Sequence, residues 1–295
     1  MTGPALGPIG VWGHLDSLGA ETARTYARRV DELGYGALWV PETAGREPFA
    51  LLGLLAGETS RLVLGTSIVG IWGHDAQTSR IAAETLAEAT DGRFVLGLGV
   101  SHPHMAARLH GQQFDRPLSR MRAYLEAYRS AVYRGPIASA GSPPVLIAAL
   151  RERMTDLAAT DADGAFPYLV TAERVGWMRA RLDAAAPDRR PILAVTLPVV
   201  LGSAPADRDA ARAYLKPYLR TPTYRSSWEL QGFTASDWEP AVSDRLLDAM
   251  VALGDRPTVL ARVEELHAAG ADHVAIIPLG PDGTTEHLPT LEALA

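Results

Sequence analysis

The chain has 295 residues, 47% of them hydrophobic, and a formal net charge of −6, so it can form one large α/β barrel or two ordinary domains, and nucleic acid or an anionic membrane is disfavoured as its main partner. The absence of cysteine excludes disulfides, thiolate catalysis and Cys-ligated metal sites, and the single lysine, Lys216, disfavours Schiff-base chemistry. Without a signal segment or an apolar run of about 20 residues, we expect a cytoplasmic protein that makes no membrane contact.

Short β-branched runs alternate with amphipathic segments along the chain. In chain order, the pattern predicts strands at Ile9–Trp12, Ala37–Val40, Leu62–Ile68, Phe94–Val100, Val145–Ala149, Gly164–Pro167, Leu193–Val200 and His273–Ile277. It predicts helices at Ala20–Leu33, Pro48–Glu58, Gln77–Thr90, Met121–Val132, Arg151–Thr160, Ala172–Ala185 and Thr258–Ala269. Eight strands alternating with helices are typical of an α/β protein with a (β/α)8 TIM barrel, and a doubly wound open sheet is the alternative.

Two features support one continuous barrel. The line Arg-x-Val-Leu-Gly-x-x-aliphatic occurs twice, at 61–68 and 93–100, on either side of a helical segment, which is the arrangement of a βαβ unit. The irregular, aromatic-rich segment Gly202–Arg256 is predicted to be a mostly helical insertion between strands seven and eight. Because no Pro-, Gly- or Ser-rich linker divides the chain, we expect a single domain over residues 1–295.

The carboxyl ends of the strands are where parallel barrels keep their chemistry. His14 follows the first strand, and His74 lies in the loop beyond the third. No HExxH pattern or paired carboxylates accompany the histidines, so no metal site is predicted. We expect His273 to be structural and His110, His267 and His287 to be surface residues.

Arg151 begins a helix directly after the fifth strand. Free backbone N–H groups and an arginine at a helix N-terminus can bind an anion, although a solvated first helical turn would show the same residues.

Taken together, these segments resemble the bacterial luciferase-like superfamily, most closely the branch that uses the deazaflavin coenzyme F-420. The matching segments are Leu-Trp-Val-Pro-Glu at 38–42, Leu-Gly-Thr-Ser-Ile at 64–68, Asp-Gly-Arg-Phe-Val-Leu-Gly-Leu-Gly-Val-Ser-His at 91–102, Asp-Arg-Pro-Leu-Ser-Arg-Met-Arg at 115–122 and Ala-Asp-Gly-Ala-Phe-Pro-Tyr at 162–168. The similarity extends over nearly the whole chain.

The resemblance implies positions for the cofactor. A non-prolyl cis peptide at Ser67–Ile68 would form a bulge behind the deazaflavin ring. Glu42 and Thr43 would border the ring, where relatives keep an Asp-His pair, and Val100, Ser101 and His102 would line the ring or its side chain. The phosphate would meet Ala149, Leu150 and Arg151, where relatives often have two glycines, and Tyr168 would cover the phosphate or the tail.

The implied activity is that of an oxidoreductase moving a hydride between coenzyme F-420 (8-hydroxy-5-deazaflavin) and a small organic substrate. His14 is the first candidate for the proton donor or acceptor and His74 the second, with Glu42 orienting either one.

Three alternatives are an FMN-dependent two-component monooxygenase on the same barrel, a flavin- or deazaflavin-binding protein without turnover, and a phosphosugar isomerase or aldolase barrel. The resemblance also implies a homodimer.

Overall fold

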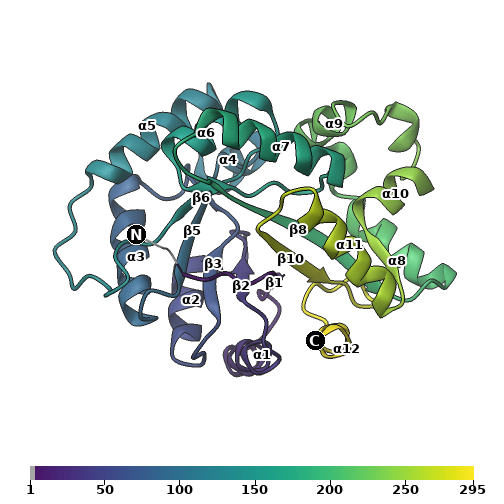
Figure 1. Cartoon of the computed structure of the whole chain (residues 1–295), viewed down its shortest axis with the longest axis horizontal. Coiled ribbons are helices and arrows are strands. Elements are labelled where there is room, and N and C mark those ends of the chain that lie inside the picture. The colour runs from purple at the N-terminus through teal and green to yellow at the C-terminus, as the bar shows by residue number, and fades with distance from the viewer. Residues whose placement is uncertain (1–3) are drawn as a thin grey trace.

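The computed structural model describes residues 4–295, so the first three residues of the expected single domain lie outside it. Eight parallel strands form a ring, because β10 pairs with β1 on one side and with β8 on the other (Figure 1). The expected TIM barrel is therefore confirmed. Its strands are β1 (Ile9–Trp12), β2 (Ala37–Val40), β3 (Val63–Thr66), β5 (Phe94–Gly99), β6 (Val145–Ile147), β7 (Gly164–Ala165), β8 (Ile192–Leu201) and β10 (His273–Pro278).

Helices surround this ring. Those expected between strands are α1 (Ala20–Glu32), α2 (Pro48–Ala56), α3 (Ala76–Ala89), α5 (Pro117–Ser130), α6 (Glu152–Asp161), α7 (Ala172–Ala185) and α11 (Arg256–Ala268). Helix α5 begins at Pro117 rather than Met121, because proline fits the first turn of a helix. Within residues 4–295, no helix is both long enough and apolar enough to cross a bilayer.

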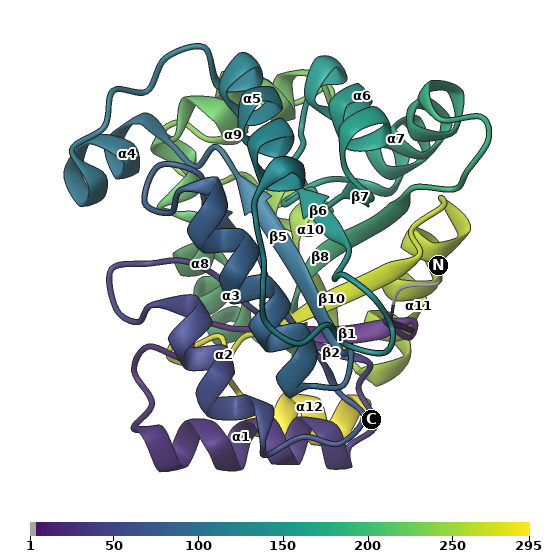
Figure 2. The same ribbon diagram turned by 90° about the vertical axis from the view of Figure 1, so that its left-hand side faces the viewer.

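Two further helices were not predicted. Helix α4 (Pro103–His110) follows β5 in the chain and precedes α5, and it projects from the barrel, as Figure 2 shows. Helix α12 (Leu288–Leu294), near the C-terminus, lies beside α1. Helix α4 ends at Gly111, whose φ of 62° is the left-handed conformation that favours glycine after a helix.

The segment between β8 and β10 is mostly helical, as expected. It contains α8 (Pro205–Leu215), η1 (Tyr218–Arg220), α9 (Pro222–Glu229), η2 (Ala235–Asp237), α10 (Asp244–Met250) and one unexpected short strand, β9 (Ala252–Gly254). Strand β9 pairs with the end of β8, outside the ring. The insertion has its own apolar contacts through buried Trp228, Phe233 and Trp238, which join the core inside the barrel.

The third predicted strand is interrupted. Strand β3 ends at Thr66, and a two-residue strand, β4 (Val69–Gly70), follows and pairs with β5 alone. The peptide bond between Ser67 and Ile68 is cis, which confirms the expected bulge. Close packing beside it requires glycine, since a Cβ on Gly97 would lie 2.0 Å from the carbonyl oxygen of Thr66.

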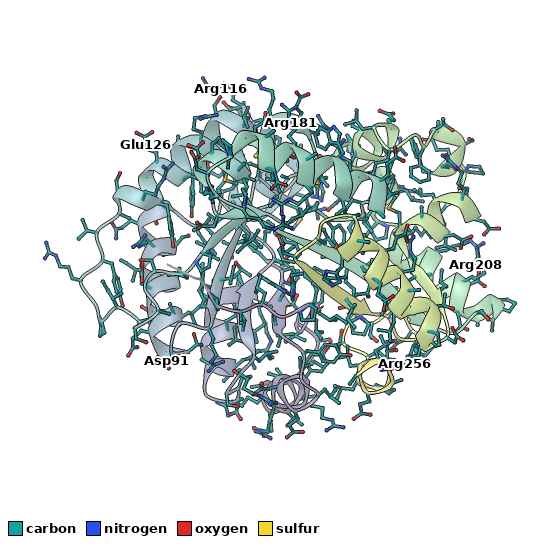
Figure 3. The ribbon with its side chains drawn as sticks, viewed as in Figure 1. Asp91, Arg116, Glu126, Arg181, Arg208 and Arg256 are labelled. Carbon is teal, nitrogen blue, oxygen red and sulfur yellow. The ribbon has the colours of Figure 1, made fainter. Side chains whose placement is uncertain are left out.

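Both faces of the strands are buried, as expected for a parallel sheet covered by helices. Trp39 fills the barrel interior, and its Nε1 donates a hydrogen bond to Nε2 of fully buried His273 at 3.0 Å. The expected structural role of His273 is thus confirmed. Charged side chains such as Glu126, Arg116 and Arg208 lie on the outside of the molecule (Figure 3).

Candidate active site

A cavity of about 530 Å³ opens at the carboxyl ends of the barrel strands. It brings together every predicted site residue except His74, from six separate chain segments. These residues are His14, Glu42, Thr43, Ser67, Ile68, Val100, Ser101, His102, Ala149, Leu150, Arg151 and Tyr168. The strand-end rule therefore located the cavity correctly.

The bulge at Ser67–Ile68 forms part of the cavity wall and is held by neighbouring strands. The indole Nε1 of Trp12 donates to the carbonyl oxygen of Ser67 at 2.9 Å. The backbone N–H of Glu42 donates to the carbonyl oxygen of Ile68 at 3.0 Å, and Glu42 Oε2 accepts from the N–H of Gly70 at 2.5 Å. Both backbone carbonyl groups of the bulge thus accept hydrogen bonds from residues that themselves line the cavity.

The other carboxylate oxygen of Glu42 faces two imidazoles. Glu42 Oε1 lies 3.6 Å from Nε2 of His110 and 4.0 Å from Nε2 of His74. His74 lies behind Glu42 rather than on the cavity wall, and it also contacts Glu47 at 3.4 Å. Among residues 4–295, no three His, Asp or Glu side chains are grouped so as to hold a metal ion.

His110 corrects one expectation. We expected a surface residue, but its side chain is only 20% exposed and packs toward Glu42 and against Gly73. No sequence pattern indicated this position, because the helix that carries His110, α4, was itself not predicted.

His14 follows β1 and lies beside Trp12, with ring centroids 4.8 Å apart. Burial lowers the pKa of His14, while Asp16 and Glu286 act in the opposite direction. The neutral imidazole is therefore favoured. Close by, the Thr43 hydroxyl donates a hydrogen bond to the Asp16 carboxylate. This bond connects the loop after β2 to the loop after β1.

His102 follows β5 and is the N-cap of α4. Burial, and secondarily the neighbouring His104, lowers the pKa of His102 to about 4, so its imidazole is neutral. Its Nδ1 is buried without a hydrogen-bond partner among the described residues. Before it, Ser101 has a φ of 51°, an uncommon conformation for a residue other than glycine.

At the fifth predicted strand, Arg151 is the exposed N-cap of α6, as the helix-start pattern indicated. The loop before it is anchored by Arg174 of α7, which donates to the carbonyl oxygen of Leu150 at 2.6 Å. The guanidinium of Arg174 also stacks on the ring of Trp177, 3.7 Å from its centroid. Arg174 was missed because its contact with the loop depends on how α6 and α7 pack.

Four tyrosines, which we call the tyrosine cluster, gather where the insertion meets β7: Tyr168, Tyr214, Tyr218 and Tyr224. The hydroxyl of Tyr168 contacts that of Tyr214 and donates to that of Tyr218 at 2.9 Å. The rings of Tyr218 and Tyr224 meet edge to face at 5.2 Å. Burial raises the pKa of all four hydroxyls, so the cluster is uncharged.

Comparison with known proteins gives consistent findings. A family model described as luciferase-like monooxygenase matches residues 5–273. A putative coenzyme F-420-dependent oxidoreductase of Mycobacterium tuberculosis is 25% identical, over 97% of this chain and 97% of the relative.

Two solved structures share the fold. An F-420-dependent secondary alcohol dehydrogenase, in complex with an F-420–acetone adduct, is 12% identical with a TM-score of 0.72, over 99% of each chain. The FMN-bound oxygenating constituent of 3,6-diketocamphane monooxygenase of Pseudomonas putida is 13% identical with a TM-score of 0.67, over 91% of this chain and 90% of that chain. Because the two carry different cofactors, the fold alone does not select between them.

Proposed function

Because this chain belongs to the family of luciferase-like monooxygenases, we propose that it is an oxidoreductase that moves a hydride between coenzyme F-420 and a small organic substrate. The observation that carries the proposal is the cavity, in which the bulge at Ser67–Ile68, the Val100–His102 segment and the start of α6 face one common space. The F-420-dependent name of the mycobacterial relative supports the choice of cofactor.

The residues present fit a flat ring with a phosphate-bearing tail. Ile68 packs against Gly99, because a Cβ added to Gly99 would lie 2.6 Å from the Ile68 side chain. The wall beside the bulge is therefore closely packed. His102 Nδ1 and Thr196 Oγ1 are buried polar atoms without a partner among the described residues, and both side chains line the cavity. Each can take a hydrogen bond from, or give one to, a bound molecule.

The phosphate is assigned to the loop Ala149–Arg151. Backbone N–H groups at the start of α6 and the Arg151 guanidinium supply the donors and the positive charge. Leu150 and Arg151 retain backbone donors in place of the glycines that relatives often have. Tyr168 would close the edge of this region.

When bound, the deazaflavin would supply or accept the hydride at its C5. The chain's own task is to orient the reactants and to handle a proton, because a substrate oxygen gains a proton when a carbonyl is reduced and loses one when an alcohol is oxidised. We assign that proton to His14, whose imidazole lines the cavity. Glu42 and His74 remain candidates for a supporting role, with His74 acting through Glu42.

Binding of the two cofactors to the purified protein tests the proposal. Fluorescence quenching with the deazaflavin should give about micromolar affinity, with FMN at least about tenfold weaker. The reverse preference would favour the FMN-dependent two-component monooxygenase. Binding of neither would overturn the proposal, and binding without turnover across a substrate screen would favour a cofactor-binding protein.

A further inference from the structure

We infer that the tyrosine cluster is the substrate wall of the cavity and that it selects an uncharged carbonyl compound or alcohol with an apolar, aromatic skeleton. This inference rests on the proposed function, which leaves the substrate open.

Tyr168, Tyr218 and Tyr224 of the cluster line the cavity, and Tyr214 contacts the hydroxyl of Tyr168. Apart from Tyr168, the residues assigned to the cofactor follow β2, β3, β5 and β6, whereas Tyr218 and Tyr224 come from the insertion. Aromatic contacts connect the two regions. The ring of Tyr168 lies 6.0 Å from Trp12 and 5.8 Å from Tyr224, and Tyr224 lies 5.3 Å from His102. A substrate placed against these rings would therefore face the bulge.

Charge argues for an uncharged ligand. Among the described lining residues, Arg151 is the one arginine and there is no lysine, and Arg151 lies at the start of α6 where the phosphate is assigned. His14 and His102 favour their neutral forms because burial lowers the pKa of each. Away from Arg151 and from the exposed His104, an anionic substrate would thus lose its hydration without gaining a cationic partner, which is costly.

A cationic substrate is disfavoured for a related reason. Glu42 is the one carboxylate among the described lining residues. Its oxygens already face the N–H of Gly70 and the imidazoles of His74 and His110.

The uncharged hydroxyl groups near the cluster could bind a single oxygen atom of a substrate. Thr196 of β8 has a buried hydroxyl without a partner among the described residues, and the hydroxyls of the cluster are neutral donors. Around them, Met105, Phe114 and Met154 add apolar surface. A few placed polar groups in an apolar, aromatic wall are characteristic of sites for small apolar molecules with one polar function.

Three probes of nearly equal size and shape test the inference: acetophenone, benzoate and benzamidinium, which are neutral, anionic and cationic. Their dissociation constants would be measured on the full chain by ligand-observed NMR, with and without deazaflavin. We expect acetophenone to bind at least about tenfold more tightly than either ion, because an unpaired charge is costly to bury. Equal or tighter binding of benzoate or benzamidinium would overturn the inference.

Variants assign the effect to the cluster. Tyr218→Leu and Tyr224→Leu keep apolar volume but remove the ring, and each should weaken acetophenone binding by about threefold to tenfold, the range of a lost aromatic contact. Tyr133→Leu, after α5 and outside the cavity, is the matched control and should change nothing. Unchanged affinity in a folded cluster variant would overturn the assignment. If neither variant folds, the order of the three probes on the unmodified chain still decides.

Failure of the proposed function would look different. If the protein discriminates among the three probes but does not bind deazaflavin, the cofactor assignment is wrong while the substrate wall stands. If it binds deazaflavin but prefers an ion, the substrate inference alone is wrong.

Discussion

Glu42 Oε1 lies 3.6 Å from Nε2 of His110, although one residue follows β2 and the other ends α4. The second oxygen of the same carboxylate accepts a hydrogen bond from the N–H of Gly70, two residues after the bulge. One side chain therefore joins the cavity wall to a partly buried imidazole. The pairing gives Glu42 two separable tasks, one that needs only an acceptor oxygen and one that needs a negative charge.

Substitution of Glu42 separates these tasks. Glu42→Ala leaves the N–H of Gly70 without its acceptor, which costs about 1–3 kcal/mol for a buried group. We expect deazaflavin affinity to fall by about tenfold. Glu42→Gln can still accept from Gly70 and should bind within about threefold of the unmodified chain. Fluorescence titration measures both, and equal losses in the two variants would show that the acceptor oxygen is not what matters.

His14 is expected to act on the proton and not on cofactor affinity. His14→Asn should lower kcat by about 100-fold, within the usual range for a positioned acid or base, while the dissociation constant of the deazaflavin stays within about twofold. His104→Asn removes an exposed imidazole at the cavity mouth and is the matched control. A kcat for His14→Asn close to that of the control would move the proton role to another residue.

The charge of Arg151 can be tested against its neighbour Arg153. Arg151 is the N-cap of α6 and Arg153 lies in its first turn. Both residues are exposed, but Arg151 lines the cavity and Arg153 does not. Arg151→Gln should weaken deazaflavin binding by about fivefold to tenfold and reduce its dependence on salt, because one phosphate contact is lost. Arg153→Gln should leave both unchanged. Similar effects in the two variants would indicate a diffuse field instead of a contact.

The sequence predicted those parts of the site that follow from strand ends. His14, Glu42 and Arg151 each come directly after a short apolar run, and a parallel barrel places such positions at one end. The bulge at Ser67–Ile68 came from the resemblance and not from the residue pattern. The barrel strands and the main helices were also predictable from the sequence, because the spacing of apolar residues encodes both.

What the sequence missed depends on contacts between distant segments. His110 reaches Glu42 only because α4 forms, and Arg174 reaches Leu150 only because α7 packs against α6. The hydroxyl of Tyr168 meets Tyr214 and Tyr218 across the start of the insertion. No short-range pattern specifies these pairs, although Glu42, Leu150 and Tyr168 are themselves predicted site residues.

Buried His273 predicts a pH dependence of stability. Burial lowers its pKa in the folded state to about 4, below the value near 6.5 of an exposed histidine. Between these values the unfolded chain binds a proton that the folded chain does not, so stability is complete above about pH 6.5 and falls as the pH decreases toward 4. The contribution of this residue over that window is about 3 kcal/mol.

Urea unfolding of the unmodified chain and of His273→Gln, at about pH 7 and about pH 4, measures this contribution. The variant starts from a lower stability, because its hydrogen bonds with Trp39 and Gly7 change, but it should lose about 3 kcal/mol less on acidification. An equal loss in both proteins would show that His273 does not carry the effect.

Close packing of Trp39 inside the barrel gives the last prediction. A Cβ on Gly65 would lie 2.3 Å from the Trp39 ring, which is fully buried and is a rigid aromatic group. Gly65→Ala should therefore destabilise the chain by about 1–3 kcal/mol, the usual cost of overpacking a core, and lower Tm by several degrees. Gly57→Ala, where no atom lies within 4 Å of the new Cβ, is the matched control and should leave Tm within about one degree. Equal melting temperatures for the two variants would mean that the barrel interior can rearrange around Trp39. The interior would then be too soft to fix the bulge at the end of the same strand.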